Sequence, residues 1–287
     1  MGRANVPKPN EGKVMPNLNV VIPSSLATTL NDAVVKRASS LDSVVTAALS
    51  QYFEIDRHRA YQISTSAALV QGAYDGAVSS RTLLAHGDFG LGTFEHLDGE
   101  MVVLDGGIYQ VRGDGSVQRR QDNFCIPFAV VSRFQPDESF DLGHVDSLEA
   151  LAQACDPHRE SDNLFYALRA DGFFARMHTR AVKPAGAGTG LAAAAKTQPE
   201  FHFADIEGTL VCLWSPRYSS SFSIPGYHFH FLSKDRTRGG HVLGCTASAL
   251  HIGMQTLYDY EVQLPQSGTF LKENLAIDTT AVLEKAE

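Results

Sequence analysis

The sequence predicts an α+β protein built mainly from β-sheet and preceded by a small strand-helix-helix module. Three observations predict this fold class. From about residue 61 onward, short apolar stretches alternate with Asp-Gly and Gly-Gly turns, as in a β-rich domain. Helical periodicity is concentrated before residue 55. The chain has 287 residues, 44% of them hydrophobic and 20% charged, which is enough to bury a core without disulfides.

The N-terminal segment divides into a tail and a module. Residues 1–16 are rich in Pro, Gly, Asn and Lys, and we expect them to be a disordered tail. Residues 17–23 alternate polar and apolar side chains as a short strand does. A helix then follows from Ser24, and a second helix from Leu41 to Phe53 carries its apolar positions on one stripe.

This order of elements over residues 17–55 resembles a ribbon-helix-helix module. Such a unit is too small to bury its own core, so the resemblance implies a homodimer in which two strands pair. In that family the outward side chains of the strand contact DNA, here Asn17 and Asn19. Residues 1–55 contain five Lys/Arg and four Asp/Glu, which is a weak footprint for a nucleic-acid partner. We therefore expect the module to dimerise rather than to bind DNA.

The remaining elements are expected from turn signals and periodicity. Residues 97–117 have Asp-Gly at three places and predict two strands between turns. Strands are also expected within 124–134, 165–182 and 208–218, and helices at 61–75, 80–85, 147–155 and 278–286. The Ala/Gly-rich residues 183–196 predict a surface loop.

Composition excludes several classes of protein. A net charge of −8 argues against broad binding to nucleic acid or anionic membranes. The four cysteines form no CxxC pair, and we expect buried free thiols in a reducing compartment. The N-terminus shows no signal peptide, and no apolar run approaches the roughly 20 residues of a membrane helix. A cytoplasmic protein with no membrane partner is expected.

The segment IPGYHFHFLSKDRTRGGHVLG, residues 224–244, contains three histidines. His228 and His230 are two apart in a predicted strand, so their side chains project to the same side. A polar connection ending in Gly-Gly turns the chain back, and His241 opens the returning strand. Three imidazoles from one hairpin can hold a divalent cation and leave positions open, as in a catalytic metal site.

The alternative is that these are hydrogen-bonded or surface histidines on a sheet. We favour the metal site because three histidines are combined in one hairpin. The other eight histidines, including His86, His96 and His178, show no second cluster in the sequence and are interpreted as structural.

Three motifs, at residues 83–101, 177–182 and 224–243, together resemble the α-acetolactate decarboxylase family. The resemblance runs from about Tyr61 to the C-terminus. It implies two β-rich subdomains that form a metal site, usually in a homodimer. It also implies a Zn²⁺ enzyme without an organic cofactor that converts 2-acetolactate to acetoin and CO₂. The glycines of GDFGLGTF lack the GxGxxG spacing and the βαβ context of a dinucleotide-binding loop.

The resemblance also implies roles for individual residues. By the resemblance, the metal ligands fall on His228, His230 and His241. The active-site glutamate and arginine fall on Glu100 and Arg180, and a C-terminal glutamate that folds back into the site falls on Glu287, or else on Glu284. The substrate is a β-keto acid, so a cation on its ketone and hydroxyl oxygens would stabilise an enediolate. Arg180, Glu100 and a bound water all remain candidates for the proton donor. Thr93 is either a pocket residue or a turn residue.

Two departures from the family suggest a rival function. The family commonly has an acidic residue just after GGHVL, where this chain has Gly244 and Cys245. The N-terminal module is also unusual. The alternative is a metabolite-sensing DNA-binding regulator with a decarboxylase-like ligand domain; a dioxygenase would instead need two histidines and a carboxylate. We favour the enzyme because the histidines, Glu100 and Arg180 are all present and residues 17–23 contain no Lys or Arg.

Overall fold

The structure, a computed structural model, describes residues 19–37, 40–52, 58–186, 189–266, 268–276 and 282–283. The expected tail at 1–16 lies outside these residues. Two compact units, residues 1–56 and 57–287, are described here one at a time. Within the described ranges, no helix is long and apolar enough to cross a membrane.

The N-terminal unit contains the two predicted helices, α1 (Ser24–Arg37) and α2 (Leu41–Tyr52). Ser40 begins α2 by accepting a hydrogen bond from the backbone N–H of Ser43, as an N-cap residue does. The predicted strand is absent over its described part, Asn19–Pro23. A ribbon strand takes its hydrogen bonds from a second chain, so a single chain offers this segment no partner. The ribbon-helix-helix module therefore stays a prediction.

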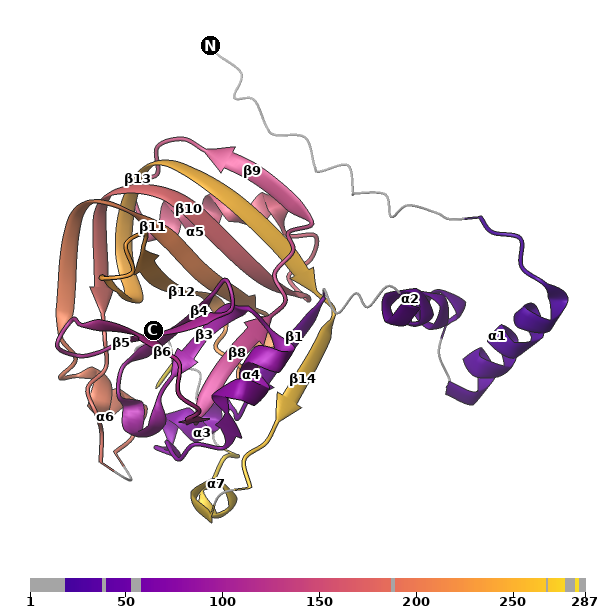
Figure 1. Cartoon of the computed structure of the whole chain (residues 1–287), viewed down its shortest axis with the longest axis horizontal. Helices are drawn as coiled ribbons and strands as arrows, with labels where there is room; N and C mark the ends of the chain where they lie inside the picture. The colour runs from indigo at the N-terminus through magenta and orange to yellow at the C-terminus, as the bar shows by residue number, and fades with distance from the viewer. Residues whose placement is uncertain are drawn as a thin grey trace, which may run out of the picture. The chain divides into compact units, whose positions relative to one another are not determined.

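The second unit contains a seven-stranded sheet in the order β14-β1-β8-β3-β4-β5-β6 (Figure 1). All neighbours are antiparallel except β1 and β14. The predicted turn at Asp105-Gly106 joins β4 to β5, and both residues have positive φ, as a tight hairpin requires. The strands are β1 (Arg59–Ile63), β3 (Phe89–Thr93), β4 (Glu100–Leu104), β5 (Gly107–Val111), β6 (Val117–Arg120), β8 (Phe128–Ser132) and β14 (Asp259–Gln263).

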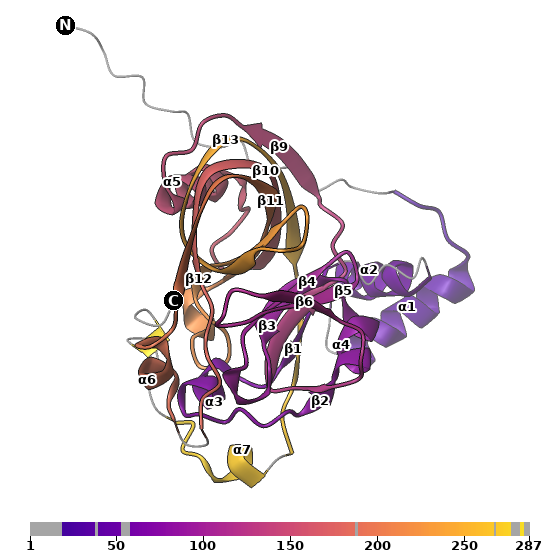
Figure 2. The same cartoon turned by 60° about the vertical axis from the view of Figure 1, so that its left-hand side comes forward.

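A second sheet is built from long strands in the order β10-β11-β12-β13-β9. Because β10 also pairs with β13, four of these strands close into a ring, which Figure 2 shows almost end-on. Closure gives the inner face of each strand a shared apolar interior. The strands are β9 (Glu138–Leu142), β10 (Phe165–Arg180), β11 (Glu200–Ser215), β12 (Gly226–Ser233) and β13 (Gly239–Leu257).

Strand alternation distributes the side chains among three apolar clusters. In β12, Phe229 and Phe231 point into the ring, whereas Leu232 points to the cluster between the two sheets. In β4, Val102 joins the same intersheet cluster, whereas Met101 packs on the opposite face of its sheet. Side chains two residues apart share a face, so Glu100 and the even-numbered histidines of β12 are directed to the space between the sheets.

Short helices complete this unit. They are α3 (Ser66–Val70), α4 (Ser80–His86), α5 (Leu148–Cys155), α6 (Leu191–Ala195) and α7 (Gly268–Lys272), with one-turn 3₁₀ helices at Glu95–Leu97, Asp156–His158 and Arg217–Ser219 and a small pair of strands, β2 (Val78–Ser79) and β7 (Cys125–Ile126). Helices expected at 80–85 and 147–155 are confirmed. The loop expected at 183–196 contains α6.

The helix expected at 61–75 was wrong over its first residues. Tyr61 and Ile63 lie in β1, between β8 and β14, and only Ser66–Val70 is helical. Both strand partners are distant in sequence, so tertiary pairing overrides the local helical pattern. The helix expected at 278–286 is helical at residues 282–283, and its remaining residues lie outside the described ranges.

All four cysteines are free thiols, as predicted. Cys155, Cys212 and Cys245 are buried, whereas Cys125 is exposed, so the expectation of four buried thiols was wrong at that position. Cys125 lies at the start of the two-residue strand β7, where its side chain faces away from the core that holds Ile126.

Candidate active site

The three predicted metal-ligating histidines meet on one hairpin. His230 of β12 lies opposite His241 of β13 in the antiparallel register, and His228 lies two residues before His230 on the same face. The ring centroids are 4.9 to 5.5 Å apart. One ligand nitrogen from each ring lies within 4.8 Å of the others. The sequence spacing is thus converted by the hairpin into one converging set.

Burial holds the imidazoles of His228 and His230 in the neutral form. His228, His230 and His241 are 8%, 1% and 5% exposed. Burial, with the Arg180 guanidinium as a second cause, lowers the pKa of His228 to about 3. Burial and the neighbouring His228 lower the pKa of His230 well below its ordinary value. Neutral rings keep lone pairs for a cation and do not require a proton to leave first.

His230 is oriented by the backbone of the facing sheet. Its Nδ1 donates to the Met101 carbonyl oxygen at 2.8 Å, and because a carbonyl only accepts, Nδ1 must carry the proton. The other nitrogen, Nε2, is fully buried and has no hydrogen-bond partner among the described residues. A Glu100 carboxylate oxygen lies 3.7 Å from it. This lone pair is therefore aimed into the site without a protein donor.

Glu100 and Arg180 reach the site from different sheets. Glu100 is the first residue of β4 and accepts a hydrogen bond from the backbone N–H of Val182 at 3.2 Å. Arg180 ends β10 directly opposite His241 in β13. Glu100 and Arg180 are each only 8% exposed. The fold thus brings one carboxylate and one permanent cation to the histidine set, as the resemblance implied.

These residues line one cavity between the sheets, with an empty volume of about 470 Å³ that is partly open to solvent. Its polar lining comprises Thr93, Glu100, Arg180, Gln198 and the three histidines, and its apolar lining includes Leu69, Val182, Leu191 and Ile224. A small anionic molecule in this space would face charged groups on one side and be shielded from water on the other.

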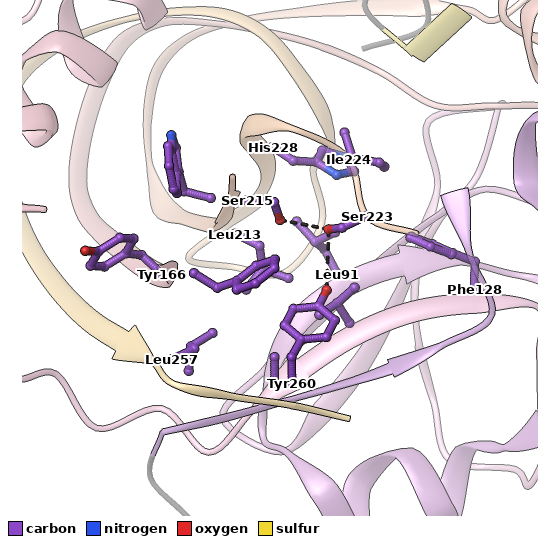
Figure 3. Close-up of a pocket in the computed structure, with 14 residues that line it drawn as sticks. Leu91, Phe128, Tyr166, Leu213, Ser215, Ser223, Ile224, His228, Leu257 and Tyr260 are labelled. Atoms are coloured by element: carbon purple, nitrogen blue, oxygen red, sulfur yellow. Dashed lines mark hydrogen bonds between the residues drawn. The ribbon is translucent and has the colours of Figure 1, made fainter. Parts of the chain in front are cut away.

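A second cavity of about 340 Å³, whose described lining residues include no charged side chain, shares His228 with the first (Figure 3). Its polar groups form a chain in which Ser215 and Ser223 are 2.8 Å apart and the Tyr260 hydroxyl donates to Ser223 at 3.4 Å. Ser223 and Ile224 lead into β12. The hydroxyl chain therefore anchors the start of the strand that presents His228.

The donor set fits a divalent cation such as zinc. His228 Nε2 and His241 Nδ1 are 3.2 Å apart, and two nitrogens bound to one tetrahedral zinc at about 2.1 Å would be separated by about 3.4 Å. The buried, unpartnered Nε2 of His230 supplies the third donor. Glu100 is near enough to His230 to be a fourth. The three histidines alone leave at least one position for substrate or water.

The family model described as alpha-acetolactate decarboxylase matches residues 60–277. The chain belongs to the α-acetolactate decarboxylase family. The alpha-acetolactate decarboxylase of Methanosarcina mazei is 38% identical over 231 residues, which cover 79% of each chain. That of Bacillus licheniformis is 36% identical over 232 residues, 79% of this chain and 90% of the relative. The crystal structure of alpha-acetolactate decarboxylase from Bacillus subtilis strain 168 has a TM-score of 0.76 at 32% identity, covering 79% of this chain and 98% of that one.

Other expectations drawn from the α-acetolactate decarboxylase family have mixed outcomes. Glu287 and Glu284 lie outside the described residues. Thr93 lines the cavity from the end of β3 and also donates to the Gly99 carbonyl at 2.8 Å, just before β4 begins. Gly244 lies opposite His178, Cys245 belongs to the apolar cluster inside the ring, and neither lines the cavity.

Two features of this decarboxylase-family site were missed by sequence reasoning. The Met101 carbonyl that orients His230 and the Val182 N–H that holds Glu100 are both backbone groups. Neither leaves a side-chain signature. Both contacts come from the packing of one sheet against the other, which belongs to the tertiary fold.

Proposed function

We propose that this protein is a metal-dependent acetolactate decarboxylase, which converts 2-acetolactate to acetoin and CO₂. The observation that carries the proposal is the convergence of three buried histidines, Glu100 and Arg180 on one cavity between the sheets. Membership of the α-acetolactate decarboxylase family supports the same reaction.

The reaction needs positive charge at a particular place. Loss of CO₂ from C2 leaves the bonding electron pair on the C2–C3 unit, with negative charge on the ketone oxygen, which is an enediolate. A Zn²⁺ ion held by His228, His230 and His241 would supply Lewis-acid charge for that oxygen and the adjacent hydroxyl. No organic cofactor is required, because the ketone of the substrate itself accepts the electron pair.

The protein side chains perform the remaining tasks. Arg180, a permanent cation that lines the cavity, would bind the substrate carboxylate or orient its hydroxyl. The apolar wall formed by Val182, Leu191 and Ile224 excludes water, which strengthens these charge interactions. The enediolate must then be protonated at C2, and Glu100, Arg180 and a water in the cavity are the candidate donors.

We also propose that a C-terminal carboxylate, Glu287 or else Glu284, completes the site. Leu283, which is 1% exposed, belongs to the same apolar cluster as Val182 and Leu191, and these two line the cavity. The Glu287→Gln and Glu284→Gln variants test the two positions separately. Substitution of the glutamate that completes the site should lower acetoin formation. Parent-level activity in both variants would reject the proposal.

The test of the function is acetoin formation from racemic 2-acetolactate, measured before chelation, after chelation and after adding back zinc. Loss of activity on chelation and its return with zinc would support both the reaction and the metal dependence. A folded, zinc-loaded chain that makes no acetoin would reject the proposed activity. Activity that survives complete metal removal would reject the metal dependence alone.

We propose further that the chain is a homodimer in which the N-terminal unit takes part. Val20, Val21, Val35 and Tyr52 are 64%, 101%, 82% and 79% exposed, which is unusual for apolar side chains within one small unit. Sedimentation equilibrium of the full chain tests this. A Val20→Asp/Ile22→Asp variant should shift the chain toward monomer, whereas Asn19→Ala should not. A variant as dimeric as the parent would exclude this contact.

A further inference from the structure

A second group of potential metal ligands lies on β10 and β11. His178 and His202 are directly opposite each other in the antiparallel register, and Glu200 lies two residues before His202 on the same face. One ligand atom from each lies within 4.8 Å of the others. None of the three lines the catalytic cavity. The sequence expectation that no histidine outside residues 228–241 belongs to a second cluster was therefore wrong.

The side chains already contact one another. His178 Nε2 and a Glu200 carboxylate oxygen are 2.8 Å apart. The His178 and His202 rings stack, with centroids 4.1 Å apart and planes at 18°. The paired strands fix the spacing between His178, His202 and Glu200. Three potential metal ligands are therefore close together without the need to order a loop.

The surroundings leave room for an ion. The His178 side chain is 31% exposed and that of Glu200 is 55% exposed. On the other flank of β10, His178 faces Gly244, where a Cβ atom would meet nothing within 4 Å. The two rings can therefore rotate out of their stack and direct nitrogen lone pairs toward the carboxylate.

We propose that His178, Glu200 and His202 form a second divalent-cation site, exposed at the surface and able to bind Zn²⁺. Two imidazoles and a carboxylate are donors that zinc accepts in tetrahedral geometry, with water in the fourth position. The rival explanation is a simple His178–Glu200 ion pair, which gives no role to His202 as a ligand. A bound ion would tie β10 to β11 beside Arg180, which pairs with Glu200 in register.

The experiment counts zinc on the full chain by equilibrium dialysis followed by metal analysis. The variants are His202→Ala and His202→Phe, the second of which keeps an aromatic ring for stacking but has no nitrogen donor. The control is His251→Ala, which removes another exposed histidine that contacts a single carboxylate, that of Asp141. We expect both His202 variants to bind one zinc fewer per chain than the parent, and His251→Ala to match the parent.

The outcomes are independent of the decarboxylase proposal, because the count is a difference between variants with intact His228, His230 and His241. Equal zinc on the parent and on His202→Phe would overturn the second site. Acetoin formation, measured on the same samples, should be unchanged in the His202 variants when the first site is loaded. A Tm that rises with zinc in the parent more than in His202→Phe would support the link between β10 and β11, and an equal rise would reject that link.

Discussion

The imidazole Nδ1 of His230, in one sheet, donates a hydrogen bond of 2.8 Å to the backbone carbonyl oxygen of Met101, in the other sheet. The Met101 side chain packs on the far face of its sheet, so the strand offers the histidine only its main chain. The bond fixes both the tautomer and the direction of Nε2, which then faces Glu100. The proposed metal ligand is thus oriented by sheet packing alone.

Replacing His230 tests the metal site directly. His230→Ala removes the buried Nε2, whose lone pair points into the cavity and would bind the metal. We therefore expect zinc retention to be lost and acetoin formation to fall by at least ~100-fold. Metal analysis and the acetoin assay measure the two effects. Near-ultraviolet circular dichroism must first establish that the variant is folded. A folded variant that keeps both stoichiometric zinc and full activity would contradict the assignment.

Glu100 has a structural contact and a chemical one, which two substitutions separate. Glu100→Gln keeps an oxygen acceptor for the Val182 N–H, so its stability should stay near that of the parent, while loss of the negative charge should lower activity by ~10–100-fold. Glu100→Ala leaves that buried N–H without a partner, which should cost a further ~1–3 kcal/mol of unfolding free energy.

Denaturant unfolding and the acetoin assay on the two Glu100 variants distinguish these effects. If Glu100→Gln were as active as the parent, the carboxylate would have no role in the chemistry. If Glu100→Ala were as stable as Glu100→Gln, the contact with Val182 would contribute nothing measurable to the fold.

The cysteines are expected to differ in reactivity with a thiol reagent at pH 8. Burial raises the pKa of Cys155 and of Cys245 to about 12, and it raises that of Cys212 well above its ordinary value. A raised pKa keeps a thiol protonated at pH 8, and the thiolate is the reactive form. We therefore expect one fast-reacting thiol, Cys125, in the native chain and four after unfolding.

The Cys125→Ser variant provides the control for this assignment. It should show no fast-reacting thiol while native and three thiols in denaturant. Fast reaction of a second cysteine in the native parent would mean that the ring interior opens, because Cys212 and Cys245 both belong to the apolar cluster inside it.

Much of the fold could be predicted from local signals. The hairpin at Asp105-Gly106 has turn chemistry that specifies its geometry, and α5 has a serine cap with apolar spacing after it. Tyr61–Ile63 could not be assigned, because its strand partners come from residues 128–132 and 259–263, far along the chain. The closure of β10 onto β13 is likewise a long-range pairing without a sequence signature.

The candidate site divides in the same way. The histidine hairpin could be predicted because strand period and turn length alone place His228, His230 and His241 together. The nearness of Glu100 required a family resemblance, since it comes from the other sheet. The cluster of His178 with His202 was overlooked because antiparallel pairing, not sequence spacing, puts these residues opposite each other.

Gly240 precedes His241 in β13, lies against the Arg180 backbone and is expected to be intolerant of a side chain. Its φ of +134° is one that L-residues rarely adopt, and a Cβ atom there would lie 2.5 Å from the Arg180 carbonyl oxygen. Gly240→Ala should therefore cost ~1–3 kcal/mol in backbone strain. It should also displace the β10 end that carries Arg180, and a shift of about 1 Å can lower activity by ~100-fold.

Gly244→Ala is the matched control, because it lies on the same strand and its Cβ would meet nothing within 4 Å. Its unfolding free energy should stay within ~0.5 kcal/mol of the parent, and its acetoin formation should be unchanged. Denaturant unfolding and the acetoin assay on the two variants compare them directly. If Gly240→Ala behaved like Gly244→Ala, the close approach of β13 to Arg180 would not be what positions the arginine against His241.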